Sequence, residues 1–506
     1  MRPFLRPFPF RPCRESDRVS PVRPEPIMSR LPIEDVLPSL RRTLTEGRNV
    51  LLTAAPGAGK TTRVPLALLD APWLDGKTLL MLEPRRLAAR AAAHRMATTL
   101  GESVGGTVGY RMRLDTKVGP KTRIEVVTEG ILGRLLQHDA ALSAYAIVLF
   151  DEFHERSLQA DTGLALCLES QRLFRPDLRL LVMSATLDCG PVSDLLGQAP
   201  VIACEGRMFP VETRYLDQPL SGYLDEAVVQ SIRRSLAQDP GSLLVFLPGM
   251  AEIRRVERKL FDLNLVSNIF IAPLHGDLPQ EAQDRAIAPA PPGTRKIVLA
   301  TSIAETSLTI DGIRVVIDAG LLRVPRFDPR SGLTRLETIR VTQDSAEQRR
   351  GRAGRLEPGV CSRLWTSAEH QSLAPRRPPE ILDADLAPLL LELALWGTNN
   401  PAELSWLTPP PAGAVAQAKE LLTGLDALNA KGQITAHGRQ MAELPLHPRL
   451  AHMLIKAVPL KLGNLACELA ALLSERDILR GPSGWRNADL RLRLDVLHGQ
   501  HDHAAG

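Results

Sequence analysis

The sequence lacks long apolar runs, paired cysteines and an abundance of aromatic residues. No apolar stretch approaches the roughly 18 residues that a membrane-spanning helix needs, so we expect no insertion into a membrane. The six cysteines show no CxxC spacing, which disfavours a zinc site and a disulfide framework and indicates a reducing, cytoplasmic environment. Aromatic residues make up only 4% of the chain, so extensive stacking on nucleic-acid bases is not expected.

A strong net charge is also missing. The excess is +5 over 506 residues, which permits a polyanionic partner without requiring one. The first 27 residues differ from the rest, because they contain six arginines and seven prolines. They have no apolar core like that of a secretion signal, and the prolines disfavour the amphipathic helix of a transit peptide. We interpret residues 1–28 as a disordered extension, with either Met1 or Met28 as the start.

Short aliphatic runs alternate with helical segments from residue 29 to residue 205. These runs carry little polar alternation, as expected for parallel strands that are covered on both faces. Strands are predicted at 49–54, 78–83, 123–128, 146–152 and 178–186, and a helix at 86–100. Strand–helix alternation of this kind predicts a doubly wound α/β domain.

A second series of the same kind occupies residues 206–372. Its predicted strands include 242–248, 296–302 and 315–320. From about residue 373 the pattern becomes helical, and 379–397 is the clearest amphipathic run. We therefore expect two α/β domains in tandem, followed by a helical region.

A glycine-rich loop follows the first predicted strand. In AAPGAGKTTR, small residues allow backbone N–H groups to surround phosphates, while the lysine reaches the β and γ phosphates and the next hydroxyl ligates Mg²⁺. Ala54 replaces the usual first glycine of this motif. The segment predicts a nucleoside triphosphate site formed by Gly57, Ala58, Gly59, Lys60, Thr61 and Thr62.

Two acidic residues, Asp151 and Glu152, end the strand predicted at 146–152. Ligands bind at the carboxyl ends of such strands, where one carboxylate can hold Mg²⁺ and its neighbour can orient the attacking water. No set of histidine and cysteine ligands surrounds His154, so we expect it to link the nucleotide site to the second domain and not to bind zinc. Hydroxyls of MSAT, at Ser184 and Thr186, can bond to the acidic site and serve the same coupling.

The second series contains a hydroxyl-rich loop, ATSIAETSLTIDG, and the arginine-rich segment QRRGRAGR at 348–355. Arginines that face a transferring phosphoryl group typically contribute about 10³–10⁵ in rate. A solvated basic helix is the alternative interpretation. Gln348 and the two interspersed glycines disfavour it, because an exposed helix gains nothing from glycine.

In this order, the segments resemble the motifs of superfamily 2 helicases of the DEAH/RHA group. The resemblance rests on AAPGAGKTT, EPRRLAAR, VTEGILGRLL, DEFHERS, MSAT, FLPGMAEI, LHGDLP, ATSIAETSLTIDG and QRRGRAGR. DEFH followed by ERSLQAD is similar to the bacterial HrpB-type branch. The similarity covers roughly residues 29–450, and the complete ordered set is highly specific.

This resemblance implies a role for each matching residue. Binding of Mg–ATP and its hydrolysis fall to Lys60, Thr61, Asp151 and Glu152, the water-positioning glutamine is Gln348, and the arginine fingers are Arg352 and Arg355. The nucleic-acid backbone would be gripped by Arg85, Arg113, Thr128 and Thr301. Arg95 matches the arginine that stacks on the base. Its usual aromatic counterpart falls at Ile287, which implies a looser adenine site and tolerance of several nucleotides.

The resemblance also implies a domain plan. Two RecA-like domains are expected at 29–205 and 206–372, with ATP between them, followed by a winged helix at 373–440 and the start of a helical, ratchet-like domain at 441–506. HrpB-type chains continue for hundreds of residues, so this sequence is expected to lack part of the nucleic-acid channel. That affects processive unwinding more than ATP hydrolysis. We expect a monomer.

The predicted activity is ATP-dependent movement along RNA, or its unwinding. Contacts mainly to the backbone predict weak sequence preference and strong salt dependence. One alternative is a DNA translocase of the same superfamily, because contacts to the 2′-hydroxyl are not fixed by these motifs. Another is a nucleotide-gated RNA clamp that hydrolyses little, although no catalytic motif is broken. A GTPase is disfavoured, since no NKxD motif occurs in the sequence.

Overall fold

The computed structural model describes residues 30–185, 188–206, 209–263, 268–306, 310–475, 477–479 and 487–500. The extension predicted at 1–28 lies outside these residues. Within them, no helix combines the length and the apolar character that crossing a membrane requires.

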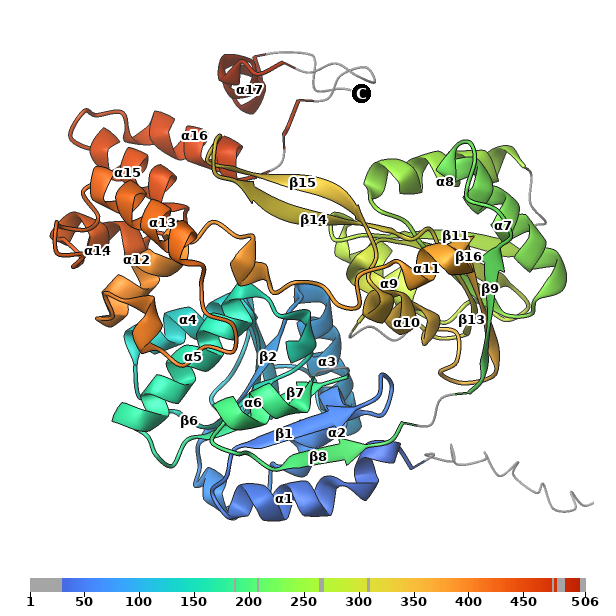
Figure 1. Ribbon diagram of the computed structural model, residues 1–506, viewed down its shortest axis with the longest axis horizontal. Coiled ribbons are helices and arrows are strands. Elements are labelled where there is room, and N and C mark those ends of the chain that lie inside the picture. Colours follow the sequence, from blue (N-terminus) through green and yellow to red (C-terminus); the bar gives the residue numbers. More distant parts are fainter. Residues whose placement is uncertain are drawn as a thin grey trace, which may run out of the picture.

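The first α/β domain is built on an eight-stranded sheet with the order β4-β3-β5-β2-β6-β7-β1-β8 (Figure 1). All neighbouring strands are parallel except the β3–β4 hairpin. The five predicted strands are confirmed to within two residues. The strands are β1 Val50–Ala54, β2 Thr78–Glu83, β3 Val108–Met112, β4 Asp115–Lys117, β5 Ile124–Thr128, β6 Tyr145–Phe150, β7 Arg179–Ser184 and β8 Val201–Cys204.

Helices cover both faces of this sheet. Successive strand residues point to opposite faces, so Val50 and Leu52 enter one core while Leu51 enters the other. The first core is closed by α1 Leu37–Thr45, α2 Lys60–Ala67 and α3 Arg86–Thr99, with the short helices η1 Pro32–Asp35 and η2 Pro72–Leu74. The second is closed by α4 Glu129–His138, α5 Leu158–Leu173 and α6 Cys189–Leu195.

The second α/β domain has a six-stranded parallel sheet with the order β11-β12-β10-β13-β16-β9. Its strands are β9 Val211–Leu216, β10 Ser242–Phe246, β11 Ile269–Leu274, β12 Arg295–Ala300, β13 Ile313–Asp318 and β16 Gly359–Thr366. Its helices are α7 Leu224–Gln238, α8 Met250–Asp262, α9 Gln280–Ile287, α10 Gln343–Arg350 and α11 Ser367–Gln371, with the short η4 Ser302–Ala304. The predicted repetition of the α/β pattern is confirmed.

An antiparallel hairpin, β14 Leu321–Asp328 and β15 Leu333–Arg340, extends from the second domain toward the C-terminal helices (Figure 1). It reaches them directly, because the Phe327 N–H donates to the Asp383 carbonyl at 3.1 Å and Gln417 Nε2 donates to the Pro329 carbonyl at 3.3 Å. Sequence patterns did not predict this hairpin, whose outward-facing residues are mostly exposed.

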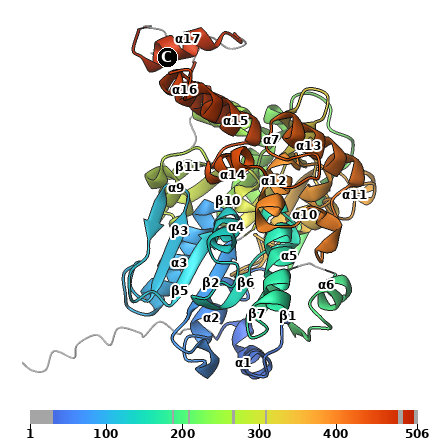
Figure 2. The same ribbon diagram turned by 90° about the vertical axis from the view of Figure 1, so that its left-hand side faces the viewer.

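The C-terminal region is helical and packs on the first domain, as both views show (Figures 1 and 2). It consists of η5 Glu380–Leu382, α12 Ala387–Trp396, η6 Pro401–Glu403, α13 Ala412–Gly424, α14 Ala436–Glu443, α15 Pro448–Ala457, α16 Gly463–Ser474 and α17 Leu490–Leu497. Buried leucines of α12 join the core of α4 and α5, so the first domain and helices α12 to α15 share one apolar core.

The run at 379–397 was predicted to be amphipathic, and this is wrong in two respects. The segment forms η5 and α12 with a break between them, and α12 is buried on most of its circumference. A helix between two other packed layers needs no polar face, which explains why its apolar residues fill more than one side.

Candidate nucleotide site in the interdomain cleft

The glycine-rich loop connects β1 to α2. Gly59 precedes α2 with φ of 98°, a left-handed conformation that favours glycine. A Cβ atom there would lie 2.8 Å from the Leu31 Cδ1 atom, so a larger residue would also clash. The loop therefore places Lys60 and Thr61 at the N-terminus of α2, where backbone N–H groups suit an anion.

Lys60 lies against the predicted acidic pair. Its Nζ atom is 2.6 Å from Glu152 Oε1 and 3.3 Å from Asp151 Oδ1, and all three side chains are at most 7% exposed. The Thr61 hydroxyl donates to Asp151 Oδ2 at 2.5 Å. The parallel sheet causes this meeting, since the loops after β1 and β6 leave the same edge.

In this buried cluster one cation, Lys60, lies against the acids Asp151 and Glu152. Burial lowers the pKa of Lys60, but the charges of Asp151 and Glu152 outweigh it, and the pKa is raised. Burial raises the pKa of Glu152, yet Lys60, His154 and Arg352 lower it to about 2. Glu152 is thus an ionised acceptor near neutral pH, as a residue that orients an attacking water must be.

Sequence reasoning missed Glu83, a third acid at the end of β2. It is fully buried, and neither carboxylate oxygen has a hydrogen-bond partner in the described part of the chain. Burial, followed by the charges of Asp151 and Glu152, raises its pKa well above the ordinary value. Glu83 could have been predicted from its position at the carboxyl end of an apolar strand, because the same kind of position identified Asp151 as a site residue.

His154 bridges the acidic pair and the motif after β7. Its Nδ1 atom lies 3.4 Å from Glu152 Oε2 and accepts from the Ala185 N–H at 3.5 Å. Ser184 is fully buried beside it, whereas Thr186 lies outside the described residues. These contacts support the predicted coupling role, which stays a prediction.

The described residues contain no cluster of three or more His, Cys, Asp or Glu side chains arranged to hold a metal by themselves. The predicted Mg²⁺ would therefore depend on Thr61, Asp151 and the phosphates of a nucleotide. Hydroxyl and carboxylate oxygens are the donors that this hard cation prefers, so the residues present fit it.

The second domain brings Gln348, Arg352 and Arg355 to the opposite side of the cleft. Gln348 and Arg352 are buried and Arg355 is half-buried, and the charges of both arginines interact with Glu152. Burial lowers the pKa of Arg355 to about 10, an effect that Glu152 and Asp311 oppose. Arg352 Nε donates to the Glu305 carbonyl at 2.9 Å. The solvated basic helix, the alternative interpretation of this segment, is excluded.

Arg349 has a structural role that the sequence did not reveal. Its guanidinium lies 3.1 Å from Glu305 Oε2 and 2.7 Å from Asp318 Oδ1, and 4.9 Å from the centre of the Phe246 ring. The side chain is 1% exposed. This buried pairing fixes α10, and with it the adjacent arginines, against the core of the second domain.

Arg85 connects the two domains. Its Nη1 atom donates to the Ser302 carbonyl at 2.6 Å, and Nη2 is 3.0 Å from Glu155 Oε2. The Thr306 hydroxyl also donates to Glu155. Arg85 was predicted to grip nucleic acid. That role stays a prediction. In this structure the Arg85 guanidinium contacts protein groups, and Glu155 and Thr306 join the candidate site as residues that sequence reasoning missed.

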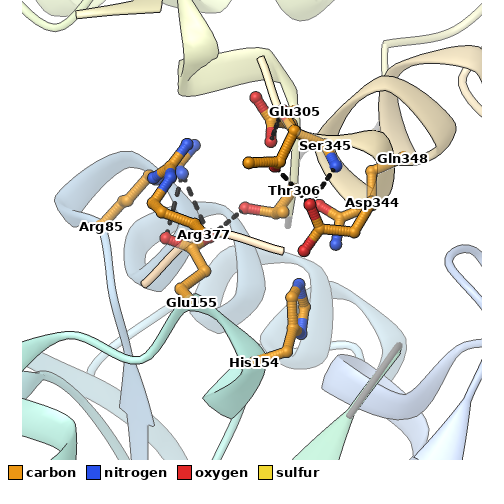
Figure 3. A pocket seen from close by; sticks show the side chains of 10 residues that line it. Arg85, His154, Glu155, Glu305, Thr306, Asp344, Ser345, Gln348 and Arg377 are labelled. Atoms are coloured by element: carbon orange, nitrogen blue, oxygen red, sulfur yellow. Dashed lines mark hydrogen bonds and ion pairs between the residues drawn. The ribbon is translucent and has the colours of Figure 1, made fainter. Parts of the chain in front are cut away.

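A pocket lies beside these contacts, between the two domains (Figure 3). His154 and Gln348 face it from opposite domains, so it adjoins the predicted hydrolysis residues. Its lining consists of Arg85, His154, Glu155, Glu305, Thr306, Thr342, Asp344, Ser345, Gln348 and Arg377.

The other predicted contact residues lie around the cleft. Arg95 is exposed on α3, one and two turns beyond Ala91 and Leu87, which pack with Ile287 of the second domain. Thr128 and Thr301 precede α4 and η4 at strand ends of the two domains. Arg113 is 59% exposed in the β3–β4 turn, and its Nη2 atom lies 3.6 Å from Glu475. Their roles toward base and backbone stay predictions.

Three domain families match the chain. DEAD/DEAH box helicase matches residues 36–195, the helicase conserved C-terminal domain matches 225–357, and the winged-helix helicase associated domain (HA2) matches 420–446. These matches follow the two α/β domains and the C-terminal helices in order.

Curated relatives show the same similarity. The chain is 49% identical to the ATP-dependent RNA helicase HrpB of Escherichia coli, over 94% of the chain and 60% of the relative. It is 37% identical to the pre-mRNA-splicing factor ATP-dependent RNA helicase prp22 of Schizosaccharomyces pombe, over 94% of the chain and 41% of the relative. The chain thus spans only part of the length of either protein.

Solved structures agree with this assignment. A crystal structure of the Escherichia coli DEAH/RHA helicase HrpB superimposes with a TM-score of 0.85, covering 94% of this chain and 59% of that one. A second, of the Escherichia coli DExH-box NTPase HrpB, gives 0.81 and covers 92% and 57%. With its two RecA-like domains, winged-helix segment and ordered motifs, the chain belongs to the DEAH/RHA group of superfamily 2 helicases.

Proposed function

We propose that this chain hydrolyses ATP in the interdomain cleft and couples the reaction to movement along RNA or its unwinding. The observation that carries the proposal is the convergence of two sets of residues on one cleft. Lys60, Asp151 and Glu152 come from the first domain, and Gln348, Arg352 and Arg355 come from the second.

In this proposal the first domain binds the phosphates through the loop at residues 57–62. Mg²⁺ held by Thr61 and Asp151 would neutralise phosphate charge. Glu152 accepts a hydrogen bond from the attacking water, and Gln348 orients that water from the other domain. Arg352 and Arg355 neutralise charge that develops on the γ-phosphate. Hydrolysis then removes the group that both domains contact, and the cleft opens.

The same proposal places adenine between Arg95 and Ile287. An aliphatic side chain offers a smaller flat surface than an aromatic ring, so selection among nucleotides should be weak. We further propose the domain boundaries 29–205, 206–372, 373–440 and 441–506, a monomeric state and a cytoplasmic location. No cysteine of the described part forms a disulfide, as expected in a reducing compartment.

RNA is favoured over DNA by the two relatives, both named ATP-dependent RNA helicases. Backbone contacts from Arg85, Arg113, Thr128 and Thr301 would give weak sequence preference and strong salt dependence. A nucleotide-gated clamp is less well supported, since the catalytic residues of both domains are present and meet in one cleft.

Steady-state ATP hydrolysis by the purified chain tests the proposal. It is measured alone, with single-stranded RNA and with DNA of matched sequence, and Glu152→Gln is the matched control. Severalfold stimulation by RNA, lost in the variant, is the expected result. Tight nucleotide-dependent RNA binding without hydrolysis would favour the clamp, and equal or greater stimulation by DNA would favour a DNA translocase.

A further inference from the structure

The segment after α11 is attached to the second domain beside the motif of the arginine fingers. The Gln343 and Asp344 N–H groups, at the start of α10, donate to the carbonyls of Ala374 and Pro375 at 2.9 and 3.1 Å. The Leu373 side chain is buried in the core that includes Ala346 of the same helix. Residues 373–375 therefore move with α10.

A few residues later the chain is attached to the first domain. The Glu380 N–H donates to the Arg156 carbonyl at 3.1 Å, and Glu380 Oε2 accepts from the Leu158 N–H at 2.9 Å. Ile381 follows, fully buried in the core of the first domain. Residues 380 and 381 therefore move with the loop after the acidic motif and with α5.

Only residues 376–379, here called the strap, connect these two attachments. Its sequence is Arg-Arg-Pro-Pro, and each proline fixes φ near −65°, so the strap is stiff. The five steps from residue 375 to residue 380 can span at most about 18 Å. The strap thus limits the distance between α10 and the start of α5.

The two arginines of the strap differ in their surroundings. Arg377 is half-buried and lines the interdomain pocket with Glu155 and Glu305, as the close view shows (Figure 3). Arg376 is exposed, and it makes no hydrogen bond or ion pair with the part of the chain that the structure describes. Arg377 is therefore the candidate functional residue of the strap, and the neighbouring Arg376 is its control in mutagenesis.

The charge of Arg377 acts on the carboxyl group of Glu305. Burial raises the pKa of its carboxyl, but the charges of Arg349 and Arg377, the hydrogen bond from Ser345 and the charge of Arg85 outweigh this, and the pKa is lowered. The Glu305 carbonyl in turn accepts hydrogen bonds from Nε and Nη2 of Arg352. Glu305 therefore interacts with Arg377 through its carboxyl and with Arg352 through its backbone carbonyl.

An anion in this pocket is a weaker explanation of Arg377. Glu155, Glu305 and Asp344 line the pocket together with only two arginines, Arg85 and Arg377. Three carboxylates face two guanidinium groups and the His154 imidazole, so the lining has no net positive charge to attract phosphate.

We propose that Arg377 is a positioning residue for ATP hydrolysis, which acts through Glu305 to hold Arg352 toward the nucleotide when the cleft is closed. The strap makes this hold depend on the separation of the two domains. The inference rests on the proposed function, because it concerns the rate of the same reaction. It assigns to a linker residue outside the helicase motifs an indirect effect on the catalytic step, through Glu305 and Arg352.

Three variants test it, namely Arg377→Gln, Arg377→Lys and Arg376→Gln. ATP hydrolysis is measured with and without single-stranded RNA, and nucleotide affinity is measured separately with a fluorescent ADP. We expect Arg377→Gln to lower kcat about tenfold in both conditions, because a misplaced catalytic group costs up to about 100-fold. KM for ATP and the ADP Kd should stay within about twofold, Arg377→Lys should recover most of kcat, and Arg376→Gln should match the unmodified chain.

Equal kcat values for Arg377→Gln and Arg376→Gln would overturn the inference while leaving the proposed function intact. So would a loss confined to KM and Kd, since that indicates nucleotide binding and not positioning of the finger. Failure of Arg377→Lys to recover activity would also contradict a role for the charge. Absence of hydrolysis by the unmodified chain would overturn the proposed function itself, which distinguishes the two failures.

Discussion

Lys60 and Glu152 form a buried ion pair with 2.6 Å between Nζ and Oε1, although 92 positions separate them in the chain. The ammonium also lies 3.3 Å from Asp151 Oδ1. One cation thus offsets a group of acids that would otherwise repel one another in a site closed to water. When a nucleotide binds, its phosphates compete for the same ammonium, so this pair connects the stability of the first domain to occupancy of the site.

Replacing Lys60 by Met should destabilise the first domain as well as abolish nucleotide binding. Removing one partner of a buried pair leaves an uncompensated charge and costs about 3–5 kcal/mol. The double variant Lys60→Met/Glu152→Gln should recover part of that loss, because neither side chain is then charged. Urea denaturation of the two single variants and the double variant measures the coupling. Additive losses would show that the pair contributes little to folding.

Arg352→Gln should lower kcat by about 10³-fold or more with little change in the affinity for ADP, because an arginine finger acts on charge that develops in the transition state. Single-turnover hydrolysis and fluorescent ADP binding provide the two measurements. Arg350→Gln, at the end of α10 two residues before Arg352, is a suitable control, since Arg350 pairs only with the exposed side of Glu347 in the described structure. A comparable loss of ADP affinity in Arg352→Gln would contradict the assignment.

Arg85 and Glu155 should behave as one interdomain contact. Arg85→Ala and Glu155→Ala should each lower hydrolysis in the absence of any polymer, and the double variant should lose little more than either single one, because contacting residues are not additive. A residue that only grips RNA would give a different result. In that case Arg85→Ala would weaken RNA affinity, shown by fluorescence anisotropy, and leave hydrolysis without RNA unchanged.

Stability should depend on pH through two half-buried acids between the first domain and the C-terminal helices. Glu392 of α12 lies against Gly133 of α4, and the Glu129 carboxylate accepts from the Ser157 hydroxyl at 2.5 Å. Burial raises the pKa of Glu392 to about 7 despite Arg134, and raises that of Glu129 to about 7 despite the hydrogen bond from Ser157. The folded chain therefore holds protons that the unfolded chain releases above a pKa of about 4.5.

Because the unfolded chain binds fewer protons between about pH 4.5 and 7, the free energy of unfolding should fall as pH rises through this window and level off above it. Each acid contributes up to about 1.4 kcal/mol per pH unit. Glu392→Gln removes one ionisation, so this variant should unfold at higher urea concentration than the parent at pH 8 and at the same concentration near pH 4.5. An unchanged difference across the pH range would exclude Glu392 as the source.

The sequence by itself determined the repeated α/β pattern and the two groups of candidate site residues, one in each domain. Parallel strands leave their ligand-binding loops at one edge, so Lys60 after β1 and Asp151 after β6 had to approach each other once the sheet formed. Local spacing also determined the arginine motif, because glycine and glutamine in QRRGRAGR do not suit an exposed helix. The arginine motif depends only on neighbouring residues in the chain. The approach of Lys60 and Asp151 depends on the arrangement of strand ends that all parallel α/β sheets share.

Only the tertiary structure decided the contacts that depend on how the domains meet. Arg85 binds Glu155 and the Ser302 carbonyl because the second domain packs against the end of β2. No local sequence pattern encodes the orientation of one domain relative to the other. The burial of Glu83 without a hydrogen-bond partner in the described structure, the break within 379–397 and the path of the strap also follow from long-range packing. Local spacing in the sequence identifies the side chains that can take part in the reaction. The packing of one domain against the other decides which partners those side chains contact.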